Sequence, residues 1–540
     1  MEKRWVVLNE NGKDLRRVLI ENRNIRDPDS FFKPHLYKLT SPSKLFPDLE
    51  KAVERIKKAI KNKELVYIYG DFDADGITGT AILWETIDLL GGKVLPFIPH
   101  RVKEGYGLHA QALKSLAKEG AKVIISVDCG VTAVDEAEIS KKLSVDLIIT
   151  DHHPIKAVVP DPFALLHDEN LAGSGVAFML AKALLESFAK SEEKQLFKNL
   201  ELATIGTIAD IVSLVGDNRI IAANGLHNLS ASNRIGLRAL YEEAAIAKRI
   251  GPYEVGFIIV PRLNAAGRME HALDSLRLLL TRNRERARQL AVKLSETNRR
   301  RQEALEGALA HARQGVQAGK LPKIIIVQNK TYPAGVIGLV AARLAEEFYR
   351  PAIVIAEGET CKGSARSICG FDIAAAIAAA AEHLETYGGH PMAAGFSVTS
   401  TEIRRFKEKI LDYAEKTLKG TDLTPTLNID TGLDGAYLNP ATLELVREFE
   451  PFGTGNPEPI FLTKNLQVIR SNPVGRGGRH TRFVFRTPAN FIVDGIGFGL
   501  GDRKVGEGQL LDTVYNLKED TWQGNGRLEL KIKDFRLAGS

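Results

Sequence analysis

The sequence is poor in the features that mark secreted or membrane proteins. Only three of its 540 residues are cysteine (Cys129, Cys361 and Cys369), too few for a disulfide framework and without metal-ligand spacing. The longest alanine-rich apolar stretch, residues 373–381, is far shorter than the ~20 residues of a membrane helix. The apolar block at residues 5–8 is too short for a signal peptide. We therefore expect a cytoplasmic protein that does not enter a membrane.

Charge of one sign is also scarce, because 73 basic residues against 67 acidic ones give a net charge of only +6. That balance is weak evidence for an anionic partner unless the basic residues are clustered. With 44% hydrophobic and 26% charged residues, the composition is that of a globular protein. At about 100–200 residues per domain, the length predicts three or four domains.

Apolar runs alternate with helical patterns in the first half of the chain. Residues 1–64 are interpreted as a leader ending in a helix at 49–60. Short apolar runs follow at 65–69, 93–98, 122–127 and 146–150, with helix-like segments between them. This alternation predicts an α/β fold with a doubly wound parallel sheet over residues 65–230.

The second half changes pattern twice. Residues 231–320 are expected to form a helical connector, ending in an arginine-rich helix over 282–314. A second alternating block, with strands at 323–328 and 352–357, predicts a smaller α/β domain over 321–420. Short strands separated by glycine, asparagine and proline then predict a small all-β barrel over 425–540.

Acidic and imidazole side chains follow three of the predicted parallel strands. The segments are YGDFDADG (Asp71, Asp73, Asp75), SVDCG (Asp128) and TDHH (Asp151, His152, His153), with Asp210 as a further candidate. The carboxyl ends of parallel strands share one edge of the sheet, so these groups should converge there. So many carboxylates repel one another unless cations neutralise them, and oxygen-rich ligands favour Mn²⁺ or Mg²⁺. We expect two ions, with Asp128 as the bridging ligand.

Each element also has a structural interpretation. The acidic loop suits a turn or a helix cap, Asp128 suits a cap, and a His-His pair suits a capped turn. Asp210 suits a buried position at a helix end. It is the combination of the segments that favours a metal site.

Taken in order, YGDFDADG, SVDCG, TDHH, TIAD and YGGH (387–390) resemble the DHH phosphoesterase superfamily. Further segments are similar to its bacterial single-strand-specific exonucleases: HRVKEGYGL (100–108), PRLNAAGR (261–268), PAGVIGLVAARL (333–344), GSARS (363–367) and EPFGTGNPEPIF (450–461). The resemblance implies a DHH catalytic domain at 65–230, a DHHA1 substrate domain at 321–420 and an OB-fold nucleic-acid-binding domain at 425–540. It implies 5′→3′ hydrolysis of single-stranded DNA to 5′-mononucleotides in DNA repair and recombination. A monomer working with single-stranded-DNA-binding protein and a helicase is expected.

The resemblance also implies a role for each residue of the centre. One ion is expected on Asp75, Asp128, His152 and Asp210, and the other on Asp73 and Asp128 with Asp71 nearby. His153 and Asp151 would orient the imidazoles or contact substrate. Many relatives have a histidine ligand where this chain has Tyr69, so the second ion should be held more weakly.

Substrate-binding residues are expected in the second domain. His390, after Gly388 and Gly389, should reach the scissile phosphate. Arg366 and Ser364, with Arg268 and Arg101, should clamp the terminal 5′-phosphate, because a guanidinium matches phosphate oxygens. The alternatives are a surface turn for the glycines and surface ion pairs for the arginines.

The barrel offers a basic track. Residues 470–486 contain five arginines and no acid, and Arg476, Arg479 and Arg482 are the candidate DNA contacts. Phe483 and Phe485, on the opposite strand face, are predicted to be core residues rather than base-stacking ones. The arginine-rich connector helix is a second candidate for nucleic-acid binding, but a solvated helix face explains its charge equally well.

Two other functions are compatible with parts of the pattern. A phosphoacceptor receiver gathers acids around one Mg²⁺ but has no use for TDHH or GGH. A phosphodiesterase acting on dinucleotides or short oligonucleotides shares the centre but needs no barrel. One departure from the family is the stretch after His153, which is shorter than usual and lacks the usual Asn-Pro. The resemblance therefore does not predict the loop beside the site.

Overall fold

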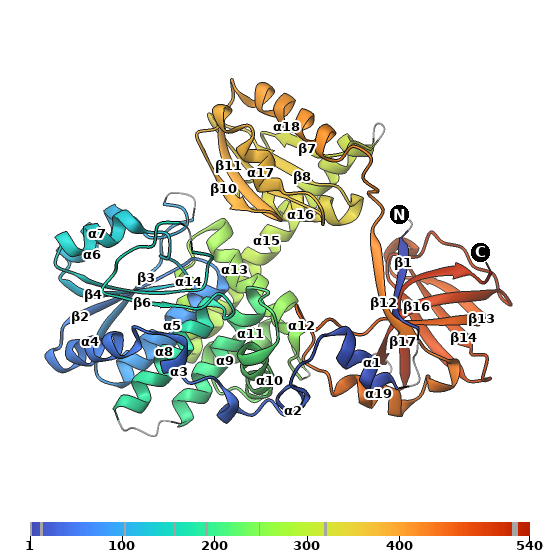
Figure 1. Cartoon of the computed structure of the whole chain (residues 1–540), viewed down its shortest axis with the longest axis horizontal. Helices are drawn as coiled ribbons and strands as arrows, with labels where there is room; N and C mark the ends of the chain where they lie inside the picture. Colours follow the sequence, from blue (N-terminus) through green and yellow to red (C-terminus); the bar gives the residue numbers. More distant parts are fainter. Residues whose placement is uncertain are drawn as a thin grey trace. The chain divides into compact units, whose positions relative to one another are not determined.

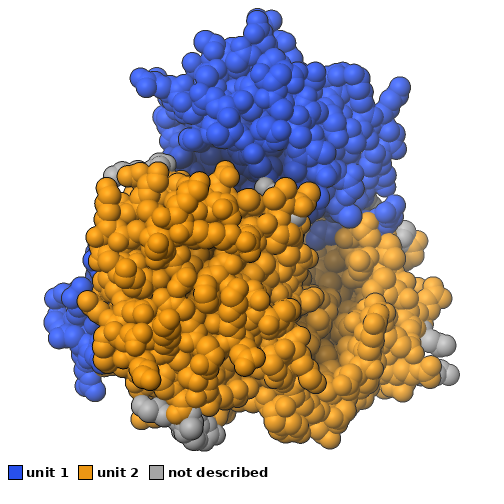
Figure 2. Space-filling model, turned by 60° about the vertical axis from the view of Figure 1, so that its left-hand side comes forward, with its two compact units in different colours: residues 1–4, 261–425 blue, residues 5–260, 426–540 orange. Residues whose placement is uncertain are grey.

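The computed structural model describes residues 3–10, 14–101, 104–155, 157–188, 193–247, 249–317, 321–520 and 527–539. The chain divides into two compact units (Figure 2), a smaller one of residues 1–4 and 261–425 and a larger one of residues 5–260 and 426–540. Val102 and Lys103 of the 100–108 segment and Lys156 of the loop after His153 lie outside the described residues. Among the described helices, none has the length and apolarity needed to cross a lipid bilayer.

A parallel five-stranded sheet organises the larger unit (Figure 1). Its order is β3-β2-β4-β5-β6, formed by β2 (Leu65–Gly70), β3 (Lys93–Phe97), β4 (Ala121–Val127), β5 (Asp146–Asp151) and β6 (Ala164–His167). The central strands β2, β4 and β5 form because their apolar, β-branched runs are buried on both faces, as in parallel sheets generally. The predicted doubly wound sheet is confirmed, but β6 was not predicted.

Helices cover both faces of this sheet. Leu113 and Leu116 of α6 (Ala110–Lys118) and Ala137 of α7 (Val134–Lys142) share one core cluster with side chains of β2, β4 and β5. The helices α4 (Leu49–Asn62), α5 (Ala74–Leu89) and α8 (Gly173–Ser187) also contact the sheet. The next helices are α9 (Glu193–Ala209) and α10 (Gly216–Ser230), and α9 ends directly before Asp210.

The smaller unit is a second α/β structure, as predicted. Its sheet has the order β10-β11-β9-β8-β7, with β7 (Ile325–Asn329) parallel to β8 (Ala352–Ala356). The remaining pairs, among β8, β9 (Thr360–Arg366), β10 (Thr386–His390) and β11 (Ala393–Thr399), are antiparallel. Its helices include α13 (Val260–Met269), α15 (Arg284–Gln317), α16 (Ile337–Phe348) and α18 (Ile403–Thr417).

The C-terminal region of the larger unit contains the predicted barrel. The strands β13 (Phe461–Val474), β14 (His480–Arg486), β15 (Ile492–Gly497), β17 (Leu528–Leu537) and β16 (Leu510–Glu519) pair in that order, and β16 pairs back onto β13. Phe483 and Phe485 are fully buried and stack at 5.2 Å, so the prediction that they are core residues is confirmed. The region is not purely β, because α19 (Pro440–Arg447) precedes the barrel.

The N-terminal residues belong to this C-terminal structure, which the interpretation of 1–64 as a leader missed. Strand β1 (Arg4–Asn9) pairs with β12 (Thr426–Gly432), which itself pairs with β13. Leu19 of α1 (Leu15–Asn22) and Phe31 of α2 (Pro28–Phe32) are buried in the barrel's core cluster. Strand pairing between residues so far apart in the chain leaves no signal in local sequence patterns.

Arg219 ties the parallel-sheet region to the C-terminal region. This side chain of α10 donates hydrogen bonds to four backbone carbonyl oxygens: Phe31 at 2.8 Å, Phe449 at 3.2 Å, Glu450 at 2.8 Å and Pro451 at 3.4 Å. Burial lowers the pKa of the guanidinium to about 10. The buried guanidinium donors are satisfied by backbone carbonyl oxygens rather than by a carboxylate. Since three of these carbonyls belong to residues 449–451, Arg219 fixes that loop against α10.

Candidate active site

The predicted acidic residues meet at the carboxyl edge of the parallel sheet. Asp71 follows β2, Asp128 follows β4 and Asp151 ends β5, and these three strands are neighbours. Backbone hydrogen bonds continue the sheet into this edge, from Asp71 N to Val127 O at 3.2 Å and from Asp128 N to Thr150 O at 2.9 Å. The convergence expected from the sequence is therefore observed.

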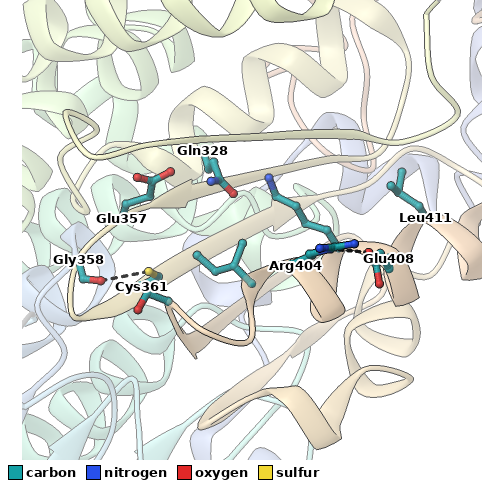
Figure 3. Close-up of a pocket in the computed structure, with 10 residues that line it drawn as sticks. Gln328, Glu357, Gly358, Cys361, Arg404, Glu408 and Leu411 are labelled. Carbon is teal, nitrogen blue, oxygen red and sulfur yellow. Dashed lines mark hydrogen bonds and ion pairs between the residues drawn. The ribbon is translucent and has the colours of Figure 1, made fainter.

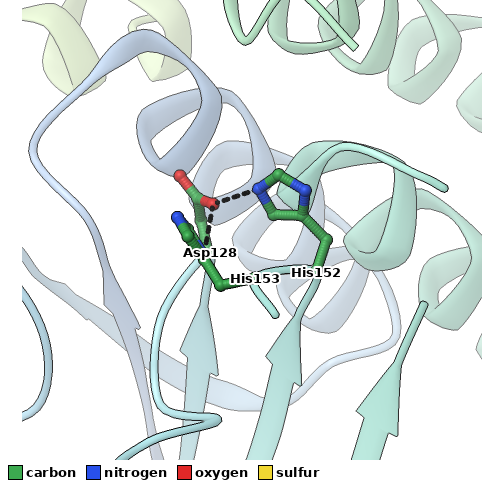
Figure 4. A group of neighbouring side chains, drawn as sticks. All are labelled: Asp128, His152 and His153. Atoms are coloured by element: carbon green, nitrogen blue, oxygen red, sulfur yellow. Dashed lines mark ion pairs between the residues drawn. The ribbon is translucent and has the colours of Figure 1, made fainter. Parts of the chain in front are cut away.

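Three groups of side chains at this edge could each hold a metal ion, because the potential ligand atoms within each group lie within 4.8 Å of one another. They are Asp71 with Asp73 and Asp128, Asp75 with His152 and Asp210, and Asp128 with His152 and His153. In Figure 4 the Asp128 carboxylate points toward both imidazoles, with Oδ1 3.2 Å from His152 Nε2 and 3.9 Å from His153 Nδ1. His152 Nε2 is also 3.4 Å from Asp210 Oδ2. The Asp128–His152 pair thus joins the first two groups.

The electrostatics of this cluster are unfavourable for the protein alone. Burial and neighbouring carboxylates raise the pKa values of Asp71 and Asp128 well above their usual range, and burial raises the pKa of Asp210 to about 8. Burial lowers the pKa of His152, so its neutral, metal-binding form is favoured. Among the described residues, the buried atoms Asp71 Oδ1, Asp128 Oδ1 and His152 Nε2 have no hydrogen-bond partner. Orphaned acceptors and like charges of this kind fit divalent cations.

The helix-capping interpretation of the acidic loop is also correct. Asp73 Oδ1 accepts from the backbone N–H groups of Asp75 at 2.9 Å and Gly76 at 3.1 Å, at the start of α5. Asp75 accepts from Gly173 N at 2.6 Å and Ser174 N at 3.0 Å, at the start of α8. These bonds fix the orientation of both carboxylates, so capping and metal binding are compatible uses of the same side chains.

Asp128 is held in an unusual backbone conformation with no space to spare. Its φ angle of 63° lies in the left-handed region, which non-glycine residues seldom adopt. A Cβ atom at Gly173 would lie 2.5 Å from Asp128 Cβ and 2.7 Å from its Oδ1, so only glycine fits there. Gly173 was not predicted from the sequence, where its only signal is its place in the motif GSG.

Several other groups orient the second histidine of TDHH. Asp151 Oδ1 is 2.8 Å from His153 Nδ1, and this bond and the positive charge of His153 outweigh burial and lower the pKa of Asp151. His167 Nε2 lies 2.7 Å from the carbonyl oxygen of His153. Tyr106 Oη lies 3.1 Å from the carbonyl oxygen of Asp128 and 3.0 Å from His153 Nδ1. Tyr106 and His167 were not predicted; the signal for Tyr106 was its place in the 100–108 segment.

Tyr69 takes no part in the three ligand groups. It is fully buried, and its hydroxyl donates to the carbonyl oxygen of Gly107 at 3.1 Å. The expectation that the second ion is weakly held for lack of a histidine here stays a prediction.

The expected 5′-phosphate residues lie in both units. In the smaller unit, Arg366 Nη1 is 3.3 Å from Ser364 Oγ on β9. Both side chains lie against the first turn of α16, since a Cβ at Gly338 would be 3.0 Å from Ser364 Oγ and 3.2 Å from Arg366 Nη2. Arg268 of α13 reaches the residues just before α16, with Nη1 3.5 Å from Gly335 O. The structure thus brings Ser364, Arg366 and Arg268 to one helix N-terminus.

The other predicted substrate residues are separate from that cluster. Arg101 belongs to the larger unit, where its guanidinium lies 4.9 Å from the Phe72 ring centroid and its charge acts against the rise in the Asp71 pKa. Gly388, Gly389 and His390 form part of the exposed edge strand β10 in the smaller unit. Their roles toward the phosphates stay predictions.

The basic track of the barrel is on its outer surface. Arg476 and Arg479 are exposed in the turn between β13 and β14. Arg482 points outward from β14 and lies 3.8 Å from the buried carboxylate of Asp520, so part of its charge is already paired.

A cavity of about 560 Å³ lies in the smaller unit, between α18 and the ends of the sheet strands (Figure 3). Arg404 Nε donates to Glu408 Oε1 at 3.0 Å on one side, and Cys361 Sγ donates to Gly358 O at 3.3 Å on the other. Its lining contains none of the predicted site residues, so it is distinct from the acidic cluster.

In the metal-free protein, the raised pKa of Asp210, about 8, should make stability fall as pH rises. The folded state holds a proton there that the unfolded state releases near pH 4, so this contribution is lost progressively between about pH 4 and pH 8. Saturating Mn²⁺ should remove the effect, because it favours the ionised carboxylates. Thermal melts in EDTA and in Mn²⁺ at about pH 6 and pH 8.5 test this; a metal-free melting temperature that rises with pH would contradict it.

The fold and the site define a DHH-type phosphoesterase class. Family models agree along the chain, with the DHH family N-terminal domain at residues 65–207, the DHHA1 domain at 321–416 and the RecJ OB domain at 429–534. The chain belongs to the RecJ family. It is 33% identical to the single-stranded-DNA-specific exonuclease RecJ of Thermus thermophilus, over 92% of this chain and 72% of the relative. The crystal structure of Thermus thermophilus RecJ with Mn²⁺ is similar with a TM-score of 0.85 and 30% identity, over 99% of this chain and 80% of that one.

The lengths of the relatives differ from that of this chain. It is 35% identical to the single-stranded-DNA-specific exonuclease RecJ of Bacillus subtilis over 90% of its own residues, but it spans only 63% of that relative.

Proposed function

We propose that the protein is a 5′→3′ exonuclease that degrades single-stranded DNA to 5′-mononucleotides with two Mn²⁺ or Mg²⁺ ions. The observation that carries the proposal is the pair of ligand groups, Asp71–Asp73–Asp128 and Asp75–His152–Asp210, joined through Asp128 and His152. Two adjoining sets of carboxylate and imidazole ligands suit a two-metal phosphodiesterase. The family of the chain and its C-terminal barrel support DNA as the substrate.

The proposed roles of the residues follow from their contacts. Asp71, Asp73, Asp75, Asp128, His152 and Asp210 hold the ions, and Asp73 and Asp75 are already oriented by their backbone donors. Asp151 and Tyr106 fix His153, whose imidazole is left to contact the substrate or carry a proton. When bound, the ions supply Lewis acidity that activates a water molecule and offsets the negative charge of the phosphodiester.

We assign recognition of the 5′ end of the strand to the cluster of side chains at the start of α16. Ser364, Arg366 and Arg268 offer a hydroxyl and guanidinium groups near a helix N-terminus, an arrangement that suits a terminal phosphate. We assign Arg101 to the same clamp, and Gly388, Gly389 and His390 to the scissile phosphate. Arg476, Arg479 and Arg482 are assigned to phosphates further along the strand, as in OB-fold proteins that bind single strands.

The alternative is a phosphodiesterase of dinucleotides or short oligonucleotides. It would use the same ligands, but the barrel with its exposed Arg476 and Arg479 favours long strands. We further propose that the protein acts as a cytoplasmic monomer beside single-stranded-DNA-binding protein and a helicase, since an exonuclease of this kind needs strands that are unwound and kept open.

The direct test uses single- and double-stranded DNA labelled at either end, incubated with Mn²⁺, Mg²⁺ or EDTA. We expect a 5′ label to appear at once as mononucleotide and a 3′ label to appear in progressively shorter strands, from single strands and only with metal. Internal cuts would contradict the exonuclease, and cleavage confined to dinucleotides would favour the alternative.

Arg366→Ala should abolish the preference for 5′-phosphorylated over 5′-hydroxyl ends. A charged hydrogen bond contributes about 1.5–3 kcal/mol, so the ratio of kcat/KM values for the two ends should fall about tenfold or more. Arg343→Ala is the matched control, because Arg343 is an exposed arginine on α16 paired with Glu346. An unchanged end preference in Arg366→Ala would place the clamp elsewhere.

A further inference from the structure

Ile211, the residue after Asp210, combines two unfavourable properties. Its φ angle is 62°, in the left-handed region, where a β-branched side chain is a genuine outlier. Its side chain is also 70% exposed, so burial does not compensate for the conformation. A residue that is both strained and exposed calls for an explanation other than folding stability.

The backbone conformation itself is imposed from both sides. On one side the N–H of Asp210 donates to Gly206 O at 2.9 Å and continues α9 by one residue. On the other side the N–H of Leu214 donates to Thr454 O at 2.7 Å. A Cβ at Gly455 would lie 1.9 Å from Ser213 Oγ, so the loop that follows α19 presses closely on this segment. The backbone is therefore anchored both before and after Ile211.

The left-handed conformation does not require isoleucine. Glycine closes a helix in this conformation without steric cost, and asparagine tolerates it well. Isoleucine at this position therefore contributes through its side chain, and an exposed apolar side chain contributes by contacting something outside the protein.

The position of Ile211 indicates what that contact is. Asp210 Oδ2 lies 3.4 Å from His152 Nε2 in the acidic cluster. Ile211 is the next residue, and the Cα atoms of consecutive residues are about 3.8 Å apart. A phosphodiester at the cluster would bring the sugar and base beside it within reach of this side chain. These are the apolar surfaces of a nucleotide.

We propose that Ile211 packs against the nucleoside that flanks the scissile phosphate and so positions the strand for cleavage. The proposal rests on the proposed function and adds to it a positioning residue that binds no metal. It also explains why an unfavourable conformation is kept directly beside a metal ligand.

The test uses three variants whose backbone and side-chain effects differ. Ile211→Gly and Ile211→Asn relieve the strain but remove the apolar contact, whereas Ile211→Leu keeps an apolar side chain. We expect the first two to melt at higher temperature than the wild type and to lose about tenfold in kcat/KM on a single-stranded oligonucleotide, mainly through KM. That loss is at the lower end of the range of roughly 10–200-fold for a missing apolar contact to a substrate. The kcat/KM of Ile211→Leu on the same oligonucleotide should stay within about twofold of the wild-type value, because leucine keeps the apolar contact.

Three outcomes would overturn the inference. Unchanged kcat/KM in Ile211→Gly and Ile211→Asn would mean that the side chain contacts no substrate. A fall in Mn²⁺ affinity by calorimetry that parallels the loss of activity would mean that Ile211 acts through Asp210. A lower melting temperature in both variants would make it a stability residue. If the wild type itself fails to cleave single-stranded DNA, the proposed function fails, which is a separate result.

Discussion

Asp128→Asn is expected to lower kcat on single-stranded DNA by about 10³-fold or more, the scale of removing an essential group from a catalytic constellation. Asp128 belongs to the group with Asp71 and Asp73, and its Oδ1 lies 3.2 Å from His152 Nε2 of the other proposed metal group, so its loss should weaken both metal positions at once. The same change should raise the melting temperature of the metal-free protein, because it removes a buried carboxylate whose pKa is raised by burial and by Asp75, Asp73 and Asp71. Single-turnover cleavage with saturating Mn²⁺, and melts in EDTA, measure the two effects.

Asp161→Asn is the matched control for this experiment. Asp161 is an exposed aspartate of the same unit, paired with Lys141 at 2.6 Å, and its replacement should leave both quantities close to those of the wild type. If Asp128→Asn kept a tenth or more of the wild-type kcat, the assignment of Asp128 to both metal positions would be wrong.

Gly173→Ala is expected to lower kcat by about 10²-fold, the cost of misplacing a catalytic group by roughly 1 Å. The new methyl group would lie 2.5 Å from Asp128 Cβ, so either Asp128 or the start of α8 must move. The N–H of Gly173 also donates to Asp75 Oδ2, and the same displacement disturbs that carboxylate. Calorimetric titration with Mn²⁺ should show weaker binding alongside the loss of turnover.

Gly175→Ala separates this effect from a general effect of alanine in α8. A Cβ at Gly175 meets Leu171 at an ordinary 3.4 Å, so this variant should fold, bind Mn²⁺ and cleave normally. Equal activity losses in the two variants would show that the contact with Asp128 is not the cause.

The strands that carry the metal site could be predicted because their signal is local. The apolar runs at β2, β4 and β5 are each followed by acidic residues, and the rule that parallel strands share an edge brings these together. Strand β6 was missed because ALLH is too short a run to distinguish from a turn or the start of a helix. The N-terminal β1 was missed because its partner β12 lies at the other end of the chain.

The convergence of the acidic and imidazole side chains could be predicted for the same reason, and the residues that orient them could not. Tyr106 and His167 lie within hydrogen-bond distance of the backbone carbonyl oxygens of Asp128 and His153, respectively. These contacts depend on three-dimensional placement rather than on the spacing of residues in the sequence. The fit of Gly173 against Asp128 depends on how closely α8 approaches the strand ends. Neither a motif nor a hydrophobic period records such an approach.

The pairing of β1 with β12 has a consequence for the order in which the protein folds. Asn22 donates to the carbonyl oxygen of Asp430, 408 residues away, and Leu19 and Phe31 are covered by side chains of the same distant region. During synthesis these residues emerge long before their partners, because the parallel sheet and the smaller unit are made in between. Contacts of such separation form slowly and leave apolar surface exposed in the meantime. The barrel core can therefore be completed only after those two parts have been synthesised, and the nascent chain must keep α1 and α2 from misassembling until then.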